Sequence, residues 1–534
     1  MVKKLLTVPV LGIMILLSFQ ATYAQFTSNL PIVKITTPGA IGTAQIQGTM
    51  DIIDNASGTN NDTDPSTFTG MIGIKLRGTT GYPKQSYSIE TWSAATVSLD
   101  TALLGMPSEN DWVLLASYPD RSFVRNILSF KLHDQMGRYA PRMRHCEVIV
   151  NGQYAGIYEF GEKIKRTVNR LDLAKLTPAD NFGENMTGGY IWKIDDEAGS
   201  GWVSSIAPPY ATTQQINFIY EYPDAGDITP AQAAYAKSYV DSFETAMSAT
   251  NFQDTSIGWR KFGAVNGFAD FMIIQELSRN YEAYRINTYL YKDKSKKMRP
   301  GPTWGFETAW KNTVNCNSAK DTGWCYNFGG ACGTEPKLPA FWWEKLTTDT
   351  AFSKEMKCAY INYRKPGNVL DTVNIFHIID SVSALLNANG ALTRNFTQWP
   401  IWAVPVVNEP TPMATDYAQE IAALKQFIVA RLSWLDTKWV SLNCPNPVGL
   451  VQTDFSNSVQ VYPNPANDIV QVEVEHSQLR LFTANVLSLQ GQLLMSETTA
   501  TGSCKFNIQH LPAGIYAIQI KSENGMTTRK LIKE

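Results

Sequence analysis

The 534-residue chain is short of the residues on which several classes of protein depend. Only five residues are His and seven are Cys, which argues against a His-based metal centre and against a fold built on disulfides. The odd number of cysteines leaves at least one thiol unpaired. Charge of one sign is also lacking, because 46 basic and 48 acidic side chains give a net charge of -2. Nucleic acid and anionic membrane surfaces, which bind strongly basic proteins, are therefore not favoured as partners.

Apolar residues, in contrast, are abundant. The hydrophobic fraction is 44%, with 14 Trp, 23 Tyr and 23 Phe, which is typical of a folded globular protein and excludes disorder for most of the chain. At about 150 residues per domain, the length predicts two to four domains.

The first residues have the order of a secretory signal peptide. Two lysines precede an apolar stretch from Leu5 to Phe19, and Thr22-Tyr23-Ala24 supplies small residues for cleavage. A membrane span is the alternative, but a stretch of about 15 residues is short for a bilayer. We interpret residues 1–24 as a signal peptide. No later stretch of about 18 apolar residues lacks charges, so we expect no transmembrane segment in the mature chain.

Residues 456–534 have the pattern of short, half-buried strands. Val470, Val472 and Val474 alternate with polar residues, as do Ile518 and Ile520, and this period of two predicts strands with one buried face. Turns are expected at Pro463-Asn464-Pro465, Gln490-Gly491 and Pro512-Ala513-Gly514. The pattern predicts a small all-β sandwich, and the turn formers of residues 441–455 predict a linker before it.

This C-terminal region also resembles the C-terminal sorting domain of type IX secretion cargo. The resemblance rests on Tyr462 to Asp468, Gly514-Ile515-Tyr516 and Arg529 to Lys533. It implies export through the periplasm, the type IX secretion machinery as partner through residues 456–534, and a secreted or cell-surface location. An accessory sandwich that binds carbohydrate or protein is the alternative.

Residues 25–440 mix strands with helices. Alternation predicts strands over residues 71–76, 86–90, 147–150, 154–160 and 190–194. Asn151-Gly152 is a strong hairpin turn between two of them. Helical spacing predicts a helix around residues 123–130, a short amphipathic helix around 268–274, and a longer helix capped by Asp416. Strands first and helices later is an α+β pattern.

Three cysteines, Cys316, Cys325 and Cys332, stand in a segment rich in Asn, Gly and Thr. Their spacings of nine and seven do not match a zinc ribbon. Export favours a disulfide that clamps a long loop, with free thiols as the alternative. Spacing does not decide which pair forms, and the partner of Cys358 is equally open.

Several stretches of the central region resemble the CotH kinase family, named for a spore-coat protein kinase. They are Ile74 to Gly78, Pro83 to Tyr87, Leu104 to Pro107, Asp111 to Leu115, Asp120 to Asn126, Asn151 to Lys163, Gly188 to Tyr190, Glu276 to Lys292 and Gly301 to Trp304. The resemblance implies an atypical protein-kinase-like fold for residues 25–440. It also implies ATP with Mg²⁺ or Mn²⁺ as cofactors, and transfer of the γ-phosphate to Ser or Thr of an exported protein.

Phosphoryl transfer needs positive charge around the phosphates, because the protein mainly positions ATP and stabilises an anionic transition state. Within the resemblance, Arg77 and Lys84 are candidates to hold phosphate oxygens. Glu162 is a candidate to orient Lys84, as a helix Glu does in ordinary protein kinases. Solvated surface charges are the alternative for all three.

Glu282 and Asn287 have the spacing of a kinase catalytic loop, in which an acidic base stands five residues ahead of a metal-binding Asn. The family has Asp at the first position, so Glu282 lengthens the arm by one methylene. We expect Glu282 as the base and Asn287 as a metal ligand, and we predict that Lys84, Glu162, Glu282 and Asn287 converge in one cleft.

The second departure from the family lies after Trp304. The family pattern is close to Asp-Phe-Asp, with the first Asp on Mg²⁺, whereas this chain reads Gly305-Phe306-Glu307. Gly305 offers no ligand, and Glu307 is the candidate substitute metal ligand. The alternative function is therefore a catalytically silent CotH-like surface protein, a pseudokinase with a binding or structural role.

A third hypothesis is glycan binding, because aromatic faces stack on sugars. It requires exposed rings at Trp310, Trp324, Trp342 and Trp343, and buried core aromatics are the alternative explanation of these residues.

Overall fold

The computed structural model describes residues 25–534, except 79–80, 196–198, 212, 334, 440–443, 445–458, 475–481, 489–492, 500–501 and 523–524. The predicted signal peptide and the turn at Gln490-Gly491 lie outside the described residues. So does the predicted linker, apart from Cys444.

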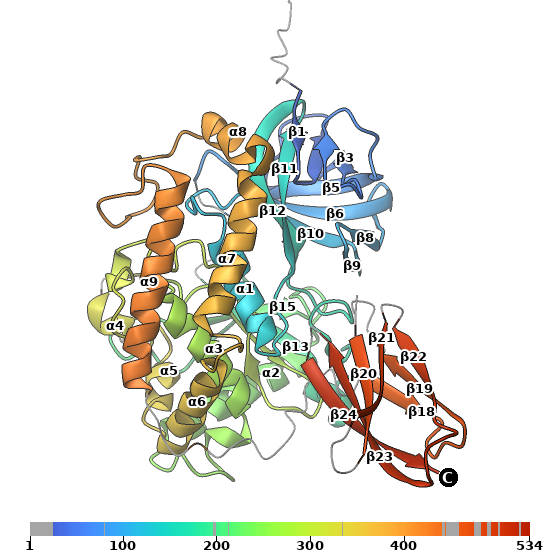
Figure 1. The fold of residues 1–534 in the computed structure, drawn as a ribbon. Helices are drawn as coiled ribbons and strands as arrows, with labels where there is room; N and C mark the ends of the chain where they lie inside the picture. The colour runs from blue at the N-terminus through green and yellow to red at the C-terminus, as the bar shows by residue number, and fades with distance from the viewer. Residues whose placement is uncertain are drawn as a thin grey trace, which may run out of the picture.

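An eight-stranded sheet closes on itself in the N-terminal part of the chain (Figure 1). The order is β10-β12-β11-β2-β3-β5-β6-β7, and β10 also pairs with β6. The strands are β2 (Ile32–Thr36), β3 (Ile46–Ile53), β5 (Phe68–Arg77), β6 (Ser86–Ala94), β7 (Val97–Ser98), β10 (Asp111–Leu115), β11 (Met143–Val150) and β12 (Gln153–Glu162). Two short pairs lie outside this sheet: β1 (Thr27–Ser28) with β4 (Asn60–Asn61), and β8 (Thr101–Leu103) with β9 (Met106–Glu109).

The closed sheet has two faces with different partners. Alternate residues form one buried cluster, among them Ile72 and Ile74 of β5 and Tyr158 and Phe160 of β12, because successive side chains of a strand point to opposite faces. Residues of the other parity, such as Ile157, belong to a second cluster shared with the helices. The turn between β11 and β12 is Asn151-Gly152, with φ of 49° and 73°, which confirms the predicted hairpin.

A second sheet and most helices form the rest of the central region (Figure 1). This sheet has the order β14-β15-β13-β16-β17, with strands β13 (Tyr190–Ile194), β14 (Gly201–Val203), β15 (Asn217–Tyr222), β16 (Thr288–Lys292) and β17 (Arg299–Pro300). The helices are α1 (Arg125–Gln135), α2 (Pro230–Ser248), α3 (Val265–Ser278), α4 (Phe328–Ala331), α5 (Phe341–Leu346), α6 (Thr350–Tyr363), α7 (Thr372–Asn387), α8 (Ala391–Gln398) and α9 (Tyr417–Lys438). The α+β class is confirmed.

The structure confirms the sequence prediction for helix α9 and contradicts the one for helix α3. The Asp416 cap of α9 is confirmed, since its Oδ1 accepts a hydrogen bond from the backbone N–H of Gln419 at 2.8 Å. The expectation of a short amphipathic helix at α3 is wrong, because α3 is buried on every side from Gly267 to Ser278. Helices α1, α6 and α9 all pack against it.

In the described part of the chain, one helical stretch, Thr372–Gln398, is long and apolar enough to cross a membrane by composition. It comprises α7 and α8. Ile375, Ile379 and Leu386 of α7 are buried in the domain core, and α7 packs on α1 and α9.

The C-terminal residues form two facing sheets with one core, as the predicted sandwich requires. One sheet has the order β18-β19-β22 and the other β21-β20-β23-β24. Val470 and Val472 of one sheet and Ile518 and Ile520 of the other are fully buried. The strands are β18 (Val459–Tyr462), β19 (Ile469–Val474), β20 (Phe482–Leu487), β21 (Leu493–Thr499), β22 (Ser503–Asn507), β23 (Gly514–Ser522) and β24 (Gly525–Lys533).

The structure contains two disulfides, and they identify the cysteine pairs that the sequence spacing did not decide. Cys316 bonds to Cys332, and Cys358 of α6 bonds to Cys444. The remaining thiols, Cys146, Cys325 and Cys504, are free and buried. The disulfide expected in the segment around residue 325 is therefore confirmed, with its middle cysteine left out.

Candidate functional site

Two loops of the central region meet at the candidate site. Residues 280–287 follow α3, and residues 301–307 follow β17. Glu282 Oε2 accepts a hydrogen bond from Asn287 Nδ2 at 2.7 Å. Asn280 links the two loops, because its Nδ2 donates to the Gly305 carbonyl at 3.0 Å and its Oδ1 accepts from the Glu282 N–H at 3.1 Å. The predicted pair Glu282 and Asn287 is thus in direct contact.

Gly305 lies against this pair with no space for a side chain. Its φ is +72°, in the left-handed region that glycine adopts most readily. A Cβ at this position would lie 2.6 Å from Asn287 Nδ2 and 2.7 Å from Glu282 Oε2. The Glu282 carboxylate therefore occupies the space into which a side chain at position 305 would extend.

Asn126, the second residue of α1, joins the site to the closed sheet. Its Oδ1 accepts from the Phe306 N–H at 2.9 Å, and its Nδ2 donates to Glu159 Oε2 of β12 at 2.9 Å. The Asn126 amide therefore fixes the loop that carries Glu307 relative to the Glu159 carboxylate. Sequence reasoning missed both residues, although both fall within stretches that resemble the family.

The carboxylates of the site hold their protons unusually tightly. Burial, with the nearby charge of Glu307, raises the pKa of Glu282 to about 7. Burial also raises the pKa of Glu307, and it raises that of Glu159 to about 8 against the opposing hydrogen bond from Asn126. Clustered carboxylates of this kind release their protons when a divalent cation binds.

Arg77 lies beside the site. Its guanidinium stands over the Trp304 ring, 5.2 Å from the ring centroid, and its positive charge lowers the pKa of Glu307 in opposition to burial. Its predicted contact with phosphate stays a prediction.

Lys84 is enclosed next to the site. It is buried, and its Nζ donates to the Ile157 carbonyl and to Asn395 Oδ1 of α8, the latter at 3.3 Å. The ammonium also lies 4.7 Å from the centroid of the Tyr158 ring. Burial lowers its pKa to about 7, and the charge of Glu159 opposes that shift. For Lys84 to reach a phosphate, Asn395 would have to move.

Glu162 is not part of this group. Its carboxylate is fully buried and accepts hydrogen bonds from Arg142 Nε at 2.6 Å, Arg170 Nη1 at 2.5 Å and the Tyr139 hydroxyl at 3.0 Å. The expectation that Glu162 orients Lys84 is wrong, because Arg142, Arg170 and Tyr139 hold the Glu162 carboxylate instead. Glu159 is the β12 carboxylate whose charge acts on Lys84.

The aromatic rings proposed for sugar stacking are core residues. Trp310, Trp342 and Trp343 are fully buried. Trp324 is partly buried and stacks on Trp439, with centroids 5.4 Å apart. The expectation of exposed rings is wrong, and glycan binding loses the observation on which it rested.

Unpaired carboxylates beside amides are typical of sites that bind divalent cations together with phosphates. The sequence profile described as CotH kinase protein matches residues 74–435. The chain therefore belongs to this family. A second profile, described as the secretion system C-terminal sorting domain, matches residues 460–534, so the resemblances predicted from the sequence are both confirmed.

Other comparisons add little. No curated protein matches the chain. Among solved structures, PorZ of Porphyromonas gingivalis, an essential bacterial surface component of the type-IX secretion system, is 19% identical with a TM-score of 0.14. The aligned part covers 16% of this chain and only 13% of the PorZ chain.

Replacing Glu162 by Ala should destabilise the domain without changing the site. The substitution leaves the fully buried Arg170 without its carboxylate, and breaking a buried ion pair costs about 3–5 kcal/mol. Urea denaturation of parent and Glu162→Ala measures this loss. Reduced cation or nucleotide affinity at unchanged stability would restore the nucleotide role and contradict the structural one.

Glu282→Gln should stabilise the protein at pH 8 more than at pH 5, in the absence of metal. The folded state raises the Glu282 pKa from 4.5 to about 7, so it binds the proton more tightly than the unfolded state. Stability from this group is then present below pH 4.5 and is lost as pH rises through 7. Gln does not titrate but still accepts from Asn287.

The measurement is the melting temperature of Glu282→Gln relative to parent at both pH values. Asp100→Asn, a charge removal at an exposed position, is the control. An equal shift at pH 5 and pH 8 would refute the raised pKa.

Proposed function

We propose that this exported CotH-family protein is an atypical, cation-dependent protein kinase that transfers the γ-phosphate of ATP to Ser or Thr of exported proteins. One observation carries the proposal. The Glu282 carboxylate lies 2.7 Å from the place of a Cβ at position 305, where the family pattern has its metal-binding Asp. The ligand is supplied from a different position of the chain rather than lost.

The residues present fit a divalent cation. Mg²⁺ is usually held by one or two carboxylates plus substrate phosphates, and Glu282 and Glu307 provide two carboxylates. Asn287 uses its Nδ2 on Glu282, which leaves its Oδ1 as a further ligand. When bound, the cation would neutralise charge on the ATP phosphates. Arg77 beside Glu307 would add positive charge near the same phosphates.

Glu282 therefore has a cation-binding role in this proposal in addition to the base role expected from spacing. Because its pKa is about 7, it loses its proton near neutral pH, and cation affinity rises through that range.

The alternative is a catalytically silent CotH-like protein with a binding or structural role at the cell surface. The enclosure of Lys84 by Ile157 and Asn395 favours it, since a phosphate cannot approach the ammonium in this arrangement.

Substitutions at positions 305 and 282 should have non-additive effects on cation binding. Gly305→Asp alone should lose cation binding, because the new side chain collides with Glu282 Oε2 and Asn287 Nδ2. Glu282→Asp added to it shortens one of the two opposing side chains, so the double variant should regain cation binding and exceed Gly305→Asp in phosphoryl transfer. The measurements are ³²P transfer to the protein and to an acidic substrate, and the thermal shift with ATP and Mg²⁺ or Mn²⁺.

Binding of the nucleotide should stabilise the parent by about 2.7 kcal/mol at 100 Kd. Full activity of Gly305→Asp without the second change would show that the two side chains do not compete. No shift and no transfer in parent or double variant would establish the silent alternative.

The sorting domain directs this protein for export to the cell surface or beyond. We propose that the mature chain begins near Gln25 and loses residues 456–534 during export by the type IX machinery. Deletion of residues 456–534 should leave the protein in the periplasm, as fractionation and immunoblotting would show. Secreted protein that still carries the peptide Val470 to Glu475, detected by mass spectrometry, would contradict the removal.

A further inference from the structure

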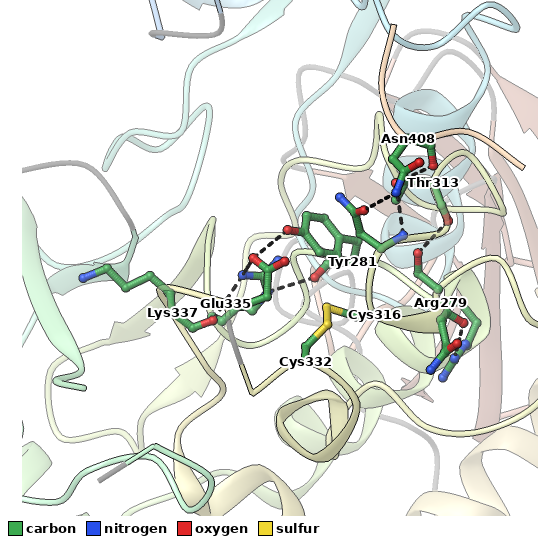
Figure 2. Close-up of a disulfide and its surroundings, with 12 residues drawn as sticks. Arg279, Tyr281, Thr313, Cys316, Cys332, Glu335, Lys337 and Asn408 are labelled. Carbon is green, nitrogen blue, oxygen red and sulfur yellow. Dashed lines mark hydrogen bonds and ion pairs between the residues drawn. A yellow bond between two sulfur atoms is a disulfide. The ribbon is translucent and has the colours of Figure 1, made fainter. Parts of the chain in front are cut away.

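We propose that the Cys316–Cys332 disulfide is a redox-sensitive clamp on the segment that carries Glu282 and Asn287. The segment from Thr313 to Lys337, apart from residue 334, forms an excursion beside Arg279 and Tyr281 (Figure 2). The two cysteines stand near its two ends.

Both ends of the excursion make polar contacts with residues 279–285, which include Glu282. At the first end, Arg279 Nη2 donates to the carbonyl of Asn317, the residue after Cys316, at 2.8 Å. At the second end, Glu335 Oε2 accepts from the Tyr281 hydroxyl at 2.8 Å and forms an ion pair with Arg285 at 3.6 Å. Figure 2 shows the Glu335 carboxylate directed at the Tyr281 hydroxyl.

The residues that Glu335 holds flank the site side chains. Tyr281 precedes Glu282, and Arg285 stands two residues before Asn287. Arg285 also donates to the Tyr281 carbonyl at 2.9 Å and to the Lys337 carbonyl at 3.1 Å. Glu335 thus fixes the turn on which the Glu282 and Asn287 contact depends.

The disulfide lies close to the Glu335 carboxylate, so its reduction would change the hydrogen-bond donors around that carboxylate. The two sulfur atoms and a Glu335 carboxylate oxygen lie within 4.8 Å of one another. An external dithiol would reduce the bond, because one of its thiolates attacks one Cys sulfur and releases the other. The dithiol is thereby oxidised to a disulfide, and Cys316 and Cys332 become thiols after a transfer of two electrons and two protons. The new S–H donors compete with Tyr281 and Arg285 for the carboxylate, and the ends of the excursion are no longer linked.

Cys325, inside the same excursion, does not take over the bond. It is fully buried, its N–H donates to Glu276 Oε2 at 2.8 Å and its Sγ faces the Gln275 carbonyl at 3.5 Å. The second disulfide, between Cys358 and Cys444, ties α6 to the chain beyond α9, so it serves as a matched control.

The test is amide hydrogen exchange of peptides covering residues 280–287 in the full chain. Dithiothreitol, or Cys316→Ser with Cys332→Ser, should speed exchange there about tenfold, whereas Cys358→Ser with Cys444→Ser should not. Glu335→Gln, which keeps both disulfides, should speed exchange in the same peptides. Mn²⁺ titration of the same proteins should show weaker binding in step with faster exchange.

Equal exchange of residues 280–287 in parent, reduced protein and Glu335→Gln would overturn the clamp. If the serine pair fails to fold, the parent under graded dithiothreitol and Glu335→Gln still decide the question. The exchange readout needs no cation, so a protein that binds no Mn²⁺ but shows the exchange difference refutes the proposed function and leaves the clamp supported.

Discussion

The closed sheet and the helices are joined by buried charges at the start of α1. Arg125 pairs with Asp120 and, at 2.7 Å, with Glu420 of α9, and its Nε donates to the Ala309 carbonyl at 3.2 Å. Losing one partner of such a buried pair is costly, since the other charge stays desolvated. The direction of α1 is therefore fixed, and with it the orientation of Asn126, which ties Glu159 to the Phe306 loop. The geometry of the site depends on this junction.

The division of β12 into two faces separates stability from the site. Glu162 lies on the side of Tyr158 and Phe160 and is neutralised by Arg142 and Arg170, whereas Glu159 lies on the side of Ile157 and meets Asn126. A single strand thus supplies one carboxylate to an ion-pair network and another to the candidate site.

Features encoded locally could be predicted from the sequence. The Asp416 cap, the Asn151-Gly152 turn and the alternation of Val470 to Val474 depend on neighbours in the chain, and each is found in the structure. The pairing of β10 with β6, which closes the sheet, depends on contacts between separate strands. The alternation of residues within one strand does not predict which strands pair. The burial of α3 was missed because it comes from surrounding helices.

The candidate site was predictable only in part for the same reason. A fixed spacing within one loop sufficed to bring Glu282 and Asn287 together. The choice between Glu159 and Glu162 required their side-chain partners, and the competition between Gly305 and Glu282 required the distance between two loops. Neither quantity is visible in the order of residues.

The buried carboxylates of the central region differ in whether a basic side chain pairs with them, and this difference supports the proposed cation site. Glu162, Glu420 and Glu409 each have an Arg within 3 Å, as buried structural carboxylates require. Among the described residues, Glu159, Glu282 and Glu307 have no basic partner at salt-bridge distance, and their pKa values are raised. As pH rises through these pKa values, such a cluster lowers the stability of the fold, because the folded state disfavours its ionised form. The arrangement makes physical sense when a cation supplies the missing positive charge.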